Sequence, residues 1–187
     1  MLCAAPRQKQ GAKEPGGAIM RWIWIDRFLD FESGKSARAI KNLSLAEDHF
    51  RDHFPGYPVM PAALILEGLA QTGGILVGEV NGFQEKVVLA KVPRAVFHRE
   101  MLAGEQLVYD AEILHLRPEG AAVQGRVSVG NELTAEAEIF FAHLDQARSG
   151  QLFGDRNFVF SGEMKYLLGR MTGDKIRTGG SAGTAEG

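Results

Sequence analysis

Ala62–Val80, which reads AALILEGLAQTGGILVGEV, is the one long stretch of this 187-residue chain that combines apolar composition with helical character. Pro61 stands directly before it, and proline is favoured at the first turn of a helix because it has no N–H group to leave unpaired. The segment therefore predicts a helix over residues 62–80. Four glycines lie inside it, and each weakens a helix by about 0.5–1 kcal/mol relative to alanine. We expect this helix to be buried on most sides, with these glycines packed closely against other elements: Gly68, Gly73, Gly74 and Gly78.

Strand patterns flank the helix on both sides. Before it, the aromatic and β-branched run Trp22–Phe28 and the alternating residues Ala37–Lys41 predict two antiparallel strands joined by a turn at residues 30–35. After it, the pattern predicts four more strands, at residues 86–92, 106–116, 121–129 and 132–144. Strand, strand, helix and then a meander of strands is an α+β order. The simplest packing is one long helix wrapped by one curved antiparallel sheet.

The composition and the two ends of the chain set the domain organisation. With 45% hydrophobic and 24% charged residues the chain is an ordinary globular protein, and we expect one domain over residues 20–145. Residues 1–19 are interpreted as a flexible leader, and residues 146–187 as an extension whose last part is disordered. The start has no apolar run long enough for a signal peptide, so a cytoplasmic location is expected. The net charge of −2 argues against nonspecific binding to nucleic acid or to a membrane.

The loop that leads into the helix carries the strongest chemical signal. His53–Pro61, HFPGYPVMP, holds three prolines in nine residues, which stiffen the backbone. His53 has the side chain that both takes and gives a proton near neutral pH. Glu67 lies among apolar residues of the helix, where a carboxyl group tends toward its neutral form and can donate a proton to a leaving group. Gln71 lies one turn further on and could hydrogen-bond Glu67.

The start of the helix would complete such a site, because its first backbone N–H groups have no partner inside the helix and can stabilise a developing oxyanion. Together these groups predict a proton-transfer site. Taken singly, His53 is more typical of a hydrogen-bonded surface histidine, and Glu67 of an exposed stripe on a helix, than either is of a catalytic group. The other histidines have no metal-ligand spacing, and the one cysteine, Cys3, excludes an intramolecular disulfide, so neither a metal site nor a disulfide is expected.

The run from His53 to Gln71, HFPGYPVMPAALILEGLAQ, resembles the signature of FabZ-type (3R)-3-hydroxyacyl-[acyl-carrier-protein] dehydratases. The resemblance extends over residues 20–145 and includes IDR at 25–27, KNLS at 41–44 and GEQ at 104–106. It implies the hot-dog fold, a long helix wrapped by an antiparallel sheet, and a role in fatty-acid biosynthesis without a cofactor. It also implies a homodimer, and dimers of this family often assemble further into trimers of dimers.

The resemblance assigns roles to particular residues. His53 would remove the C2 proton of a 3-hydroxyacyl thioester, and Glu67 of the partner subunit would protonate the departing hydroxyl group. Glutamate at this position, where an isomerase-capable sister family has aspartate, favours plain dehydration. The acyl carrier protein, which is acidic, would meet a basic patch in a segment that contains no acid between residues 86 and 99. The residues assigned to the substrate are Ala62, Met60, Tyr57, Gln71 and Phe97, and those assigned to the carrier protein are Lys91, Arg94 and Arg99.

One position departs from the family pattern, which usually has glycine where this chain has Ala62. A methyl group there is expected to restrict φ and to crowd the thioester. Two alternatives follow from the same fold. One is a thioesterase that hydrolyses the acyl thioester, and the other is a noncatalytic subunit that binds the acyl carrier protein without turnover. On charge alone, the basic segment also fits a solvated strand face.

Overall fold

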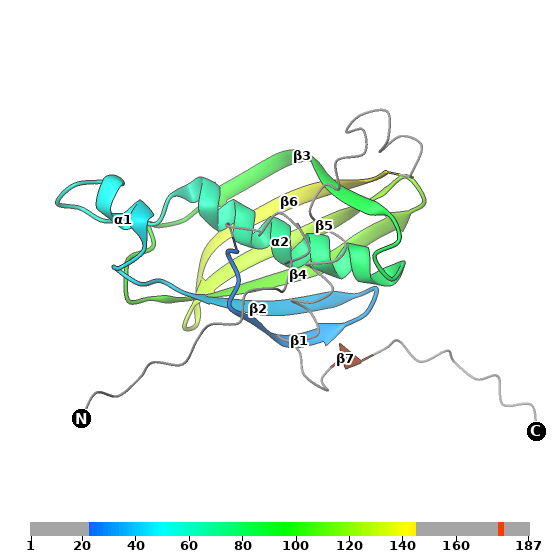
Figure 1. Ribbon diagram of the computed structural model, residues 1–187, viewed down its shortest axis with the longest axis horizontal. Helices are drawn as coiled ribbons and strands as arrows, with labels where there is room; N and C mark the ends of the chain where they lie inside the picture. Colours follow the sequence, from blue (N-terminus) through cyan, green and yellow to red (C-terminus); the bar gives the residue numbers. More distant parts are fainter. Residues whose placement is uncertain (1–22, 145–175, 178–187) are drawn as a thin grey trace, which may run out of the picture.

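The computed structural model describes residues 23–144 and 176–177, and Figure 1 shows their arrangement. The predicted leader, residues 1–19, lies outside the described residues, as does the predicted extension apart from residues 176–177. The described part forms one sheet with a long helix across it. The helices are α1 (Asp48–Asp52) and α2 (Ala62–Val80). The strands are β1 (Arg27–Glu32), β2 (Ser36–Asn42), β3 (Lys86–Phe97), β4 (Gln106–Arg117), β5 (Gly120–Val129), β6 (Glu132–Leu144) and β7 (Ile176–Arg177).

The strand order in the described sheet is β3-β6-β5-β4-β2-β1-β7. The pairs from β3 to β1 are antiparallel, and only β7 joins β1 in parallel. Figure 1 shows the sheet curving around α2, with β3 along one edge and α1 beside the first turn of α2. The predicted α+β architecture, one helix wrapped by a curved antiparallel sheet, is confirmed.

Close packing explains the glycines of α2. A Cβ atom at Gly68 would overlap the ring of Tyr109 on β4, and one at Gly73 would lie 3.2 Å from Phe141 on β6. At Gly78 the nearest neighbour would be Phe83, at 3.0 Å. Glycine at these positions lets α2 approach the sheet more closely than alanine would, so the cost in helix propensity is offset by packing.

The apolar composition of α2 is explained by its burial inside the protein. Among the described helices, α2 is long and apolar enough to span a membrane by length and composition, yet 61% of its most apolar window is buried inside the protein. Its core neighbours include Phe31, Leu107 and Ile139, which are fully buried on three different strands. The helix is thus the centre of the hydrophobic core, as its sequence predicts.

The first strand was predicted too early in the chain. The ladder of β1 begins at Arg27, so the aromatic run before it is not part of the strand. Trp24 is buried, but its backbone N–H donates to the side chain of Gln71 at 2.8 Å instead of to a neighbouring strand. The strand then continues through Glu32 into the segment that was predicted as a turn. Strand β3 also runs further than predicted, to Phe97.

Candidate active site

A rigid turn shapes the loop between α1 and α2. The backbone N–H of Tyr57 donates to the carbonyl of Phe54 at 2.9 Å, and Pro55 and Gly56 fill the two central positions. Gly56 has φ +82°, the left-handed conformation that the third residue of a type II turn requires. The far end of the loop is fixed by Met60, whose N–H donates to the carbonyl of Met101 at 2.8 Å. Local sequence therefore sets the turn, and a tertiary contact sets its position.

The hydrogen bond of the His53 ring determines its tautomer. Nδ1 lies 3.2 Å from the carbonyl oxygen of Val59. A carbonyl oxygen only accepts, so Nδ1 carries the proton and Nε2 keeps its lone pair. The backbone carbonyl of His53 in turn accepts from the N–H of Val59 at 3.0 Å, and the ring stacks on Phe54 with centroids 4.1 Å apart. His53 is half-buried and is oriented as a base.

Glu67 is held by its neighbour one turn along α2. Gln71 Nε2 donates to Glu67 Oε1 at 2.9 Å, which confirms the contact predicted from the spacing of these residues. Gln71 is buried, with 3% of its surface exposed, whereas Glu67 is only partly buried. The expectation of a carboxyl group enclosed by apolar residues is therefore wrong for the single chain, because one face of the helix at this level remains open.

Within the described part of one chain, no hydrogen bond or ion pair joins His53 to Glu67. Glu67 stands five residues after the first residue of α2, which is about 7–8 Å along the helix axis. The resemblance implies that these two groups meet in one site across a dimer, with Glu67 supplied by the partner subunit.

Ala62 is the first residue of α2 and is exposed. Its backbone is helical, so the expected restriction of φ is no obstacle to alanine at this position. Pro61 accepts from the N–H groups of Leu64 and Ile65, at 2.9 and 3.2 Å. The earlier N–H groups at Ala62 and Ala63 have no partner within the helix, and both residues are exposed. They are available as donors to an oxyanion.

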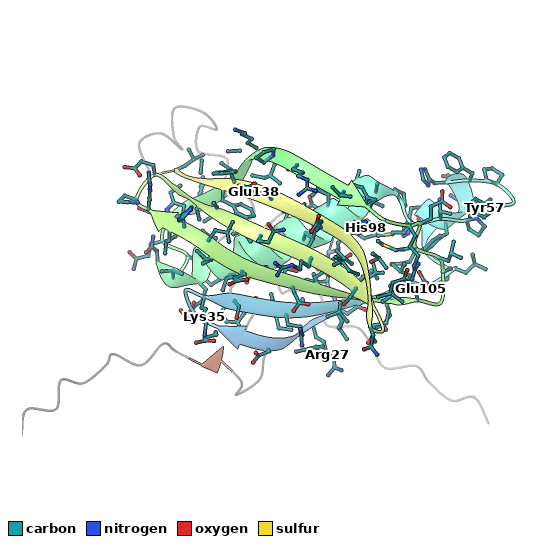
Figure 2. All side chains as sticks on the ribbon, turned by 180° about the vertical axis from the view of Figure 1, so that it is seen from behind. Arg27, Lys35, Tyr57, His98, Glu105 and Glu138 are labelled. Carbon is teal, nitrogen blue, oxygen red and sulfur yellow. The ribbon has the colours of Figure 1, made fainter. Side chains whose placement is uncertain are left out.

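The other residues assigned to the substrate differ in exposure. Met60, near the end of the loop, is buried, with 3% exposed. Phe97 ends β3 and is 39% exposed. Tyr57 projects from the loop at one end of the molecule, the same end as His98 and Glu105 (Figure 2), and its hydroxyl donates to Glu100 at 2.7 Å. No cluster of three or more His, Cys, Asp or Glu side chains in the described residues is arranged to hold a metal ion.

Two of the three basic residues predicted for carrier binding form ion pairs with acidic side chains from outside the segment 86–99. Arg94 NH2 lies 3.5 Å from Glu136, and Arg99 forms ion pairs at 3.0 Å with both Glu105 and Glu132. Glu132 and Glu136 are distant in sequence and Glu105 lies six residues beyond Arg99, so the segment 86–99 by itself gave no sign of them. Of the three residues predicted for carrier binding, Lys91 alone is without an acidic partner among the described residues, and its ammonium group lies 5.6 Å from the ring centre of Phe140.

A groove of about 500 Å³ beside Lys91 contains two basic residues that sequence reasoning missed, His115 and Arg117. Its floor is apolar. Phe140 alternates with Phe141, which packs on α2, so Phe140 points to the other face of the sheet. The pairings Lys91–Phe140, Phe140–Ala122 and Ala122–His115 place these residues in one row across four strands. Strand register, which joins residues far apart in sequence, was the signal needed to find this groove.

Comparisons with known proteins agree with this geometry. A family model described as a FabA-like domain matches residues 19–138. The 3-hydroxyacyl-[acyl-carrier-protein] dehydratase FabZ of Pelotomaculum thermopropionicum is 42% identical over 122 residues, which cover 65% of this chain and 87% of that protein. The protein of the same name from Listeria welshimeri is 40% identical over 125 residues, covering 66% of this chain and 87% of the relative.

Solved structures support the fold alone. A conserved protein from Pseudomonas aeruginosa aligns with a TM-score of 0.53 at 21% identity, covering 63% of this chain and 87% of the other. A Streptococcus mutans protein, solved bound to acetyl CoA, aligns with a TM-score of 0.52 at 15% identity over the same shares. The central helix and curved sheet are those of the hot-dog fold, as predicted. On sequence, the chain belongs to the FabZ-type 3-hydroxyacyl-[acyl-carrier-protein] dehydratase family.

Proposed function

We propose that this chain eliminates water from a (3R)-3-hydroxyacyl-[acyl-carrier-protein] to give the trans-2-enoyl thioester in fatty-acid biosynthesis. The observation that carries the proposal is the orientation of His53. Its Nδ1–H is committed to the carbonyl of Val59, which leaves Nε2 as a base beside the first turn of α2. A positioned base of this kind typically accelerates proton transfer by about 10²–10⁴-fold.

The elimination is divided among three groups. Nε2 of His53 takes a proton from C2 of the substrate, and the electron pair of that bond moves onto the thioester oxygen to form an enolate, which then collapses to form the C2–C3 double bond. The C3–O bond breaks, and the leaving hydroxyl takes a proton from Glu67 of the partner subunit to depart as water. The exposed N–H groups at Ala62 and Ala63 donate to the thioester oxygen while it carries negative charge. One 3-hydroxyacyl thioester thus gives one enoyl thioester and one water molecule, and the reaction needs no oxidant or reductant.

The dimer that this mechanism requires would form along β3. This strand pairs with β6 on one side, and no described strand pairs with its other edge. It exposes Leu89 and Phe97, 46% and 39% respectively. A long free edge with apolar side chains is a template for a second strand, and a twofold axis would join β3 to its own copy in antiparallel fashion. That symmetry supports a site made from the loop of one chain and the helix of the other.

The groove beside Lys91 supports a docking place for the acidic carrier protein. In an antiparallel pair, the first half of β3 lies beside the last half of the partner's β3, which leads toward the partner's His53 loop. The groove would thus flank the site of the neighbouring chain. Glu119 also lines the groove, but no ion pair joins Lys91 or Arg117 to a described acid, so both charges can meet acids on the carrier.

The activity is tested by following formation of the enoyl thioester from a 3-hydroxyacyl carrier protein. We expect His53→Ala and Glu67→Gln each to lower kcat by at least about 100-fold. His98→Ala is the matched control, since His98 is exposed and lies outside the proposed site. Release of free thiol in place of enoyl product would establish a thioesterase, and carrier binding without turnover by the wild-type protein would establish a binding subunit; either result contradicts the proposal.

Carrier docking has its own test. Lys91→Glu and Arg117→Glu should raise KM for the carrier-bound substrate by about 10-fold, because a repulsive charge replaces an attractive one. Arg27→Glu is the control, because it makes the same change of charge at an exposed position on β1, which four strands separate from β3 in the described sheet. The same variants should leave turnover of a small pantetheine thioester unchanged. Equal effects on both substrates would place the docking surface elsewhere.

A further inference from the structure

Gln71 is tied into the protein at both ends of its side-chain amide. Oε1 accepts from the backbone N–H of Trp24 at 2.8 Å, and Nε2 donates to Glu67 Oε1 at 2.9 Å. Gln71 is 3% exposed, so these bonds are formed away from solvent. Trp24 belongs to the segment that precedes β1 and lies 47 residues away in sequence. The amide therefore bridges the segment before β1 and the acid of the proposed active site.

The bond to Trp24 fixes which way the amide points. A backbone N–H only donates, so the atom of Gln71 that faces Trp24 must be the oxygen. The NH2 group must then face Glu67, whatever the proton state of that residue. An amide that donates to one oxygen of a carboxyl group makes that oxygen an acceptor, so a proton on the same carboxyl group must reside on the other oxygen.

We propose that Gln71 is a positioning residue that makes Oε2 of Glu67 the proton-donating oxygen, because the backbone N–H of Trp24 fixes the orientation of the Gln71 amide. The inference rests on the proposed dehydratase function. Oε1 of Glu67 is occupied by the Gln71 amide, while Oε2 has no hydrogen bond or ion pair with any described residue and is the oxygen left for substrate. The fold thereby determines which oxygen of Glu67 gives its proton to the leaving hydroxyl group.

The same contact serves the chemical step. When Oε2 gives its proton to the leaving hydroxyl, Glu67 becomes an anion, and the hydrogen bond from Gln71 to Oε1 becomes charge-assisted and stronger. The hydrogen bond from Gln71 to Glu67 is therefore stronger while the C3–O bond breaks than it is in the bound substrate complex. It does not touch the C2 proton, which His53 removes. Loss of Gln71 should therefore impair cleavage of the C3–O bond selectively.

The test separates the two halves of the reaction in D2O. Deuterium that enters C2 of recovered 3-hydroxyacyl substrate reports proton removal by His53, and enoyl product reports the complete elimination. Gln71→Met removes the two described hydrogen bonds of the amide, to Trp24 and to Glu67. Gln71→Glu keeps an acceptor for Trp24 but puts an oxygen against Glu67 in place of the N–H donor. We expect both variants to lower kcat by about 10- to 100-fold with KM changed less than about 3-fold, and to raise the ratio of C2 exchange to elimination.

Thr72→Val is the matched control. Thr72 is the next residue on α2, is fully buried, and donates to the carbonyl of Gly68 without touching Glu67. It should alter thermal stability alone and leave the exchange ratio at the wild-type value. An unchanged ratio in both folded Gln71 variants, or wild-type turnover by Gln71→Glu, would overturn the role of Gln71 while the dehydratase assignment stood. Absence of elimination by the wild-type protein would instead remove the function on which the inference depends.

Discussion

His49 lies one helical turn before His53, and its burial makes the stability of the folded chain depend on pH. Its ring centre is 5.3 Å from that of Trp24 and 4.3 Å from that of Phe50, and its carbonyl accepts from the N–H of His53 at 3.0 Å. Burial lowers the pKa of His49 below its ordinary value of 6.5, with smaller contributions from neighbouring charges. The charged imidazole is disfavoured there because it would lose hydration without gaining a hydrogen-bond partner for Nε2.

The sign of the pH effect follows from linkage. Because the pKa of His49 is lower in the folded chain, the unfolded chain binds more protons once the pH falls below 6.5. The contribution of neutral His49 to stability is complete above pH 6.5 and is lost as the pH falls from there toward the folded pKa. We expect His49→Phe to reduce the drop in Tm between pH 7 and pH 5, measured by calorimetry. His98→Phe controls for the general loss of one imidazole, and an identical drop in the His49 variant would contradict the prediction.

At the scale of elements, the contact between α2 and β4 depends on Gly68. Tyr109 of β4 lies against this glycine and is fully buried, and burial raises the pKa of its phenol. The side chain cannot move outward, because it is enclosed by the core on all sides. A methyl group at residue 68 would therefore push α2 away from the sheet or displace the aromatic ring.

We expect Gly68→Ala to lower the free energy of unfolding by about 1–3 kcal/mol through overpacking. Gly74→Ala is the matched control on the same helix, because its Cβ would meet the nearest atom, of Phe141, at 3.4 Å in ordinary contact. That variant should be neutral or gain up to about 1 kcal/mol, as replacement of a helical glycine does where space allows. Urea denaturation of both proteins measures the difference. Equal stability of the two variants would show that α2 does not depend on this close approach.

At the scale of the whole molecule, the proposed active site depends on assembly. Among the described residues of one chain, no strand pairs with the outer edge of β3, and the first residues of α2 are exposed, although both carry apolar side chains. Leu89 faces the same side of the sheet as α2, since it pairs with Phe141. A second chain would cover this surface and supply the missing acid or base of each site.

We expect the wild-type protein to run as a dimer in size-exclusion chromatography with light scattering, and Leu89→Glu to shift it toward the monomer. Because each site uses groups from two chains, dehydratase activity should fall with the dimer fraction and recover in part at higher protein concentration. Leu114→Glu is the control, since Leu114 is equally exposed, at 44%, but lies on β4 away from the open edge. A monomeric wild-type protein with full activity would refute the shared site.

Particular residues show which parts of the fold were predictable. The bounds of α2 agree with the sequence at both ends, because Pro61 and Asn81 mark them locally and the composition between is helical. The contact between Glu67 and Gln71 was predictable for the same reason, as it depends only on helical spacing. The first strand was misplaced because Trp24 gives its backbone hydrogen bond to a side chain 47 residues away. A local pattern carries no information about such a partner.

By itself the sequence determined the central helix, the meander of strands, the stiff loop that carries His53, and the family. These depend on short-range preferences and on residues that lie close together in the chain. Only the tertiary structure decided that Arg94 and Arg99 are neutralised by acids from β6 and from the β3–β4 connection, that Arg117 and Lys91 border one groove, and that the backbone N–H of Trp24 fixes the orientation of the Gln71 amide. The physical reason is common to all three: charge pairing and hydrogen-bond polarity depend on distances between side chains of different segments, which only the packing of the helix, strands and connections fixes.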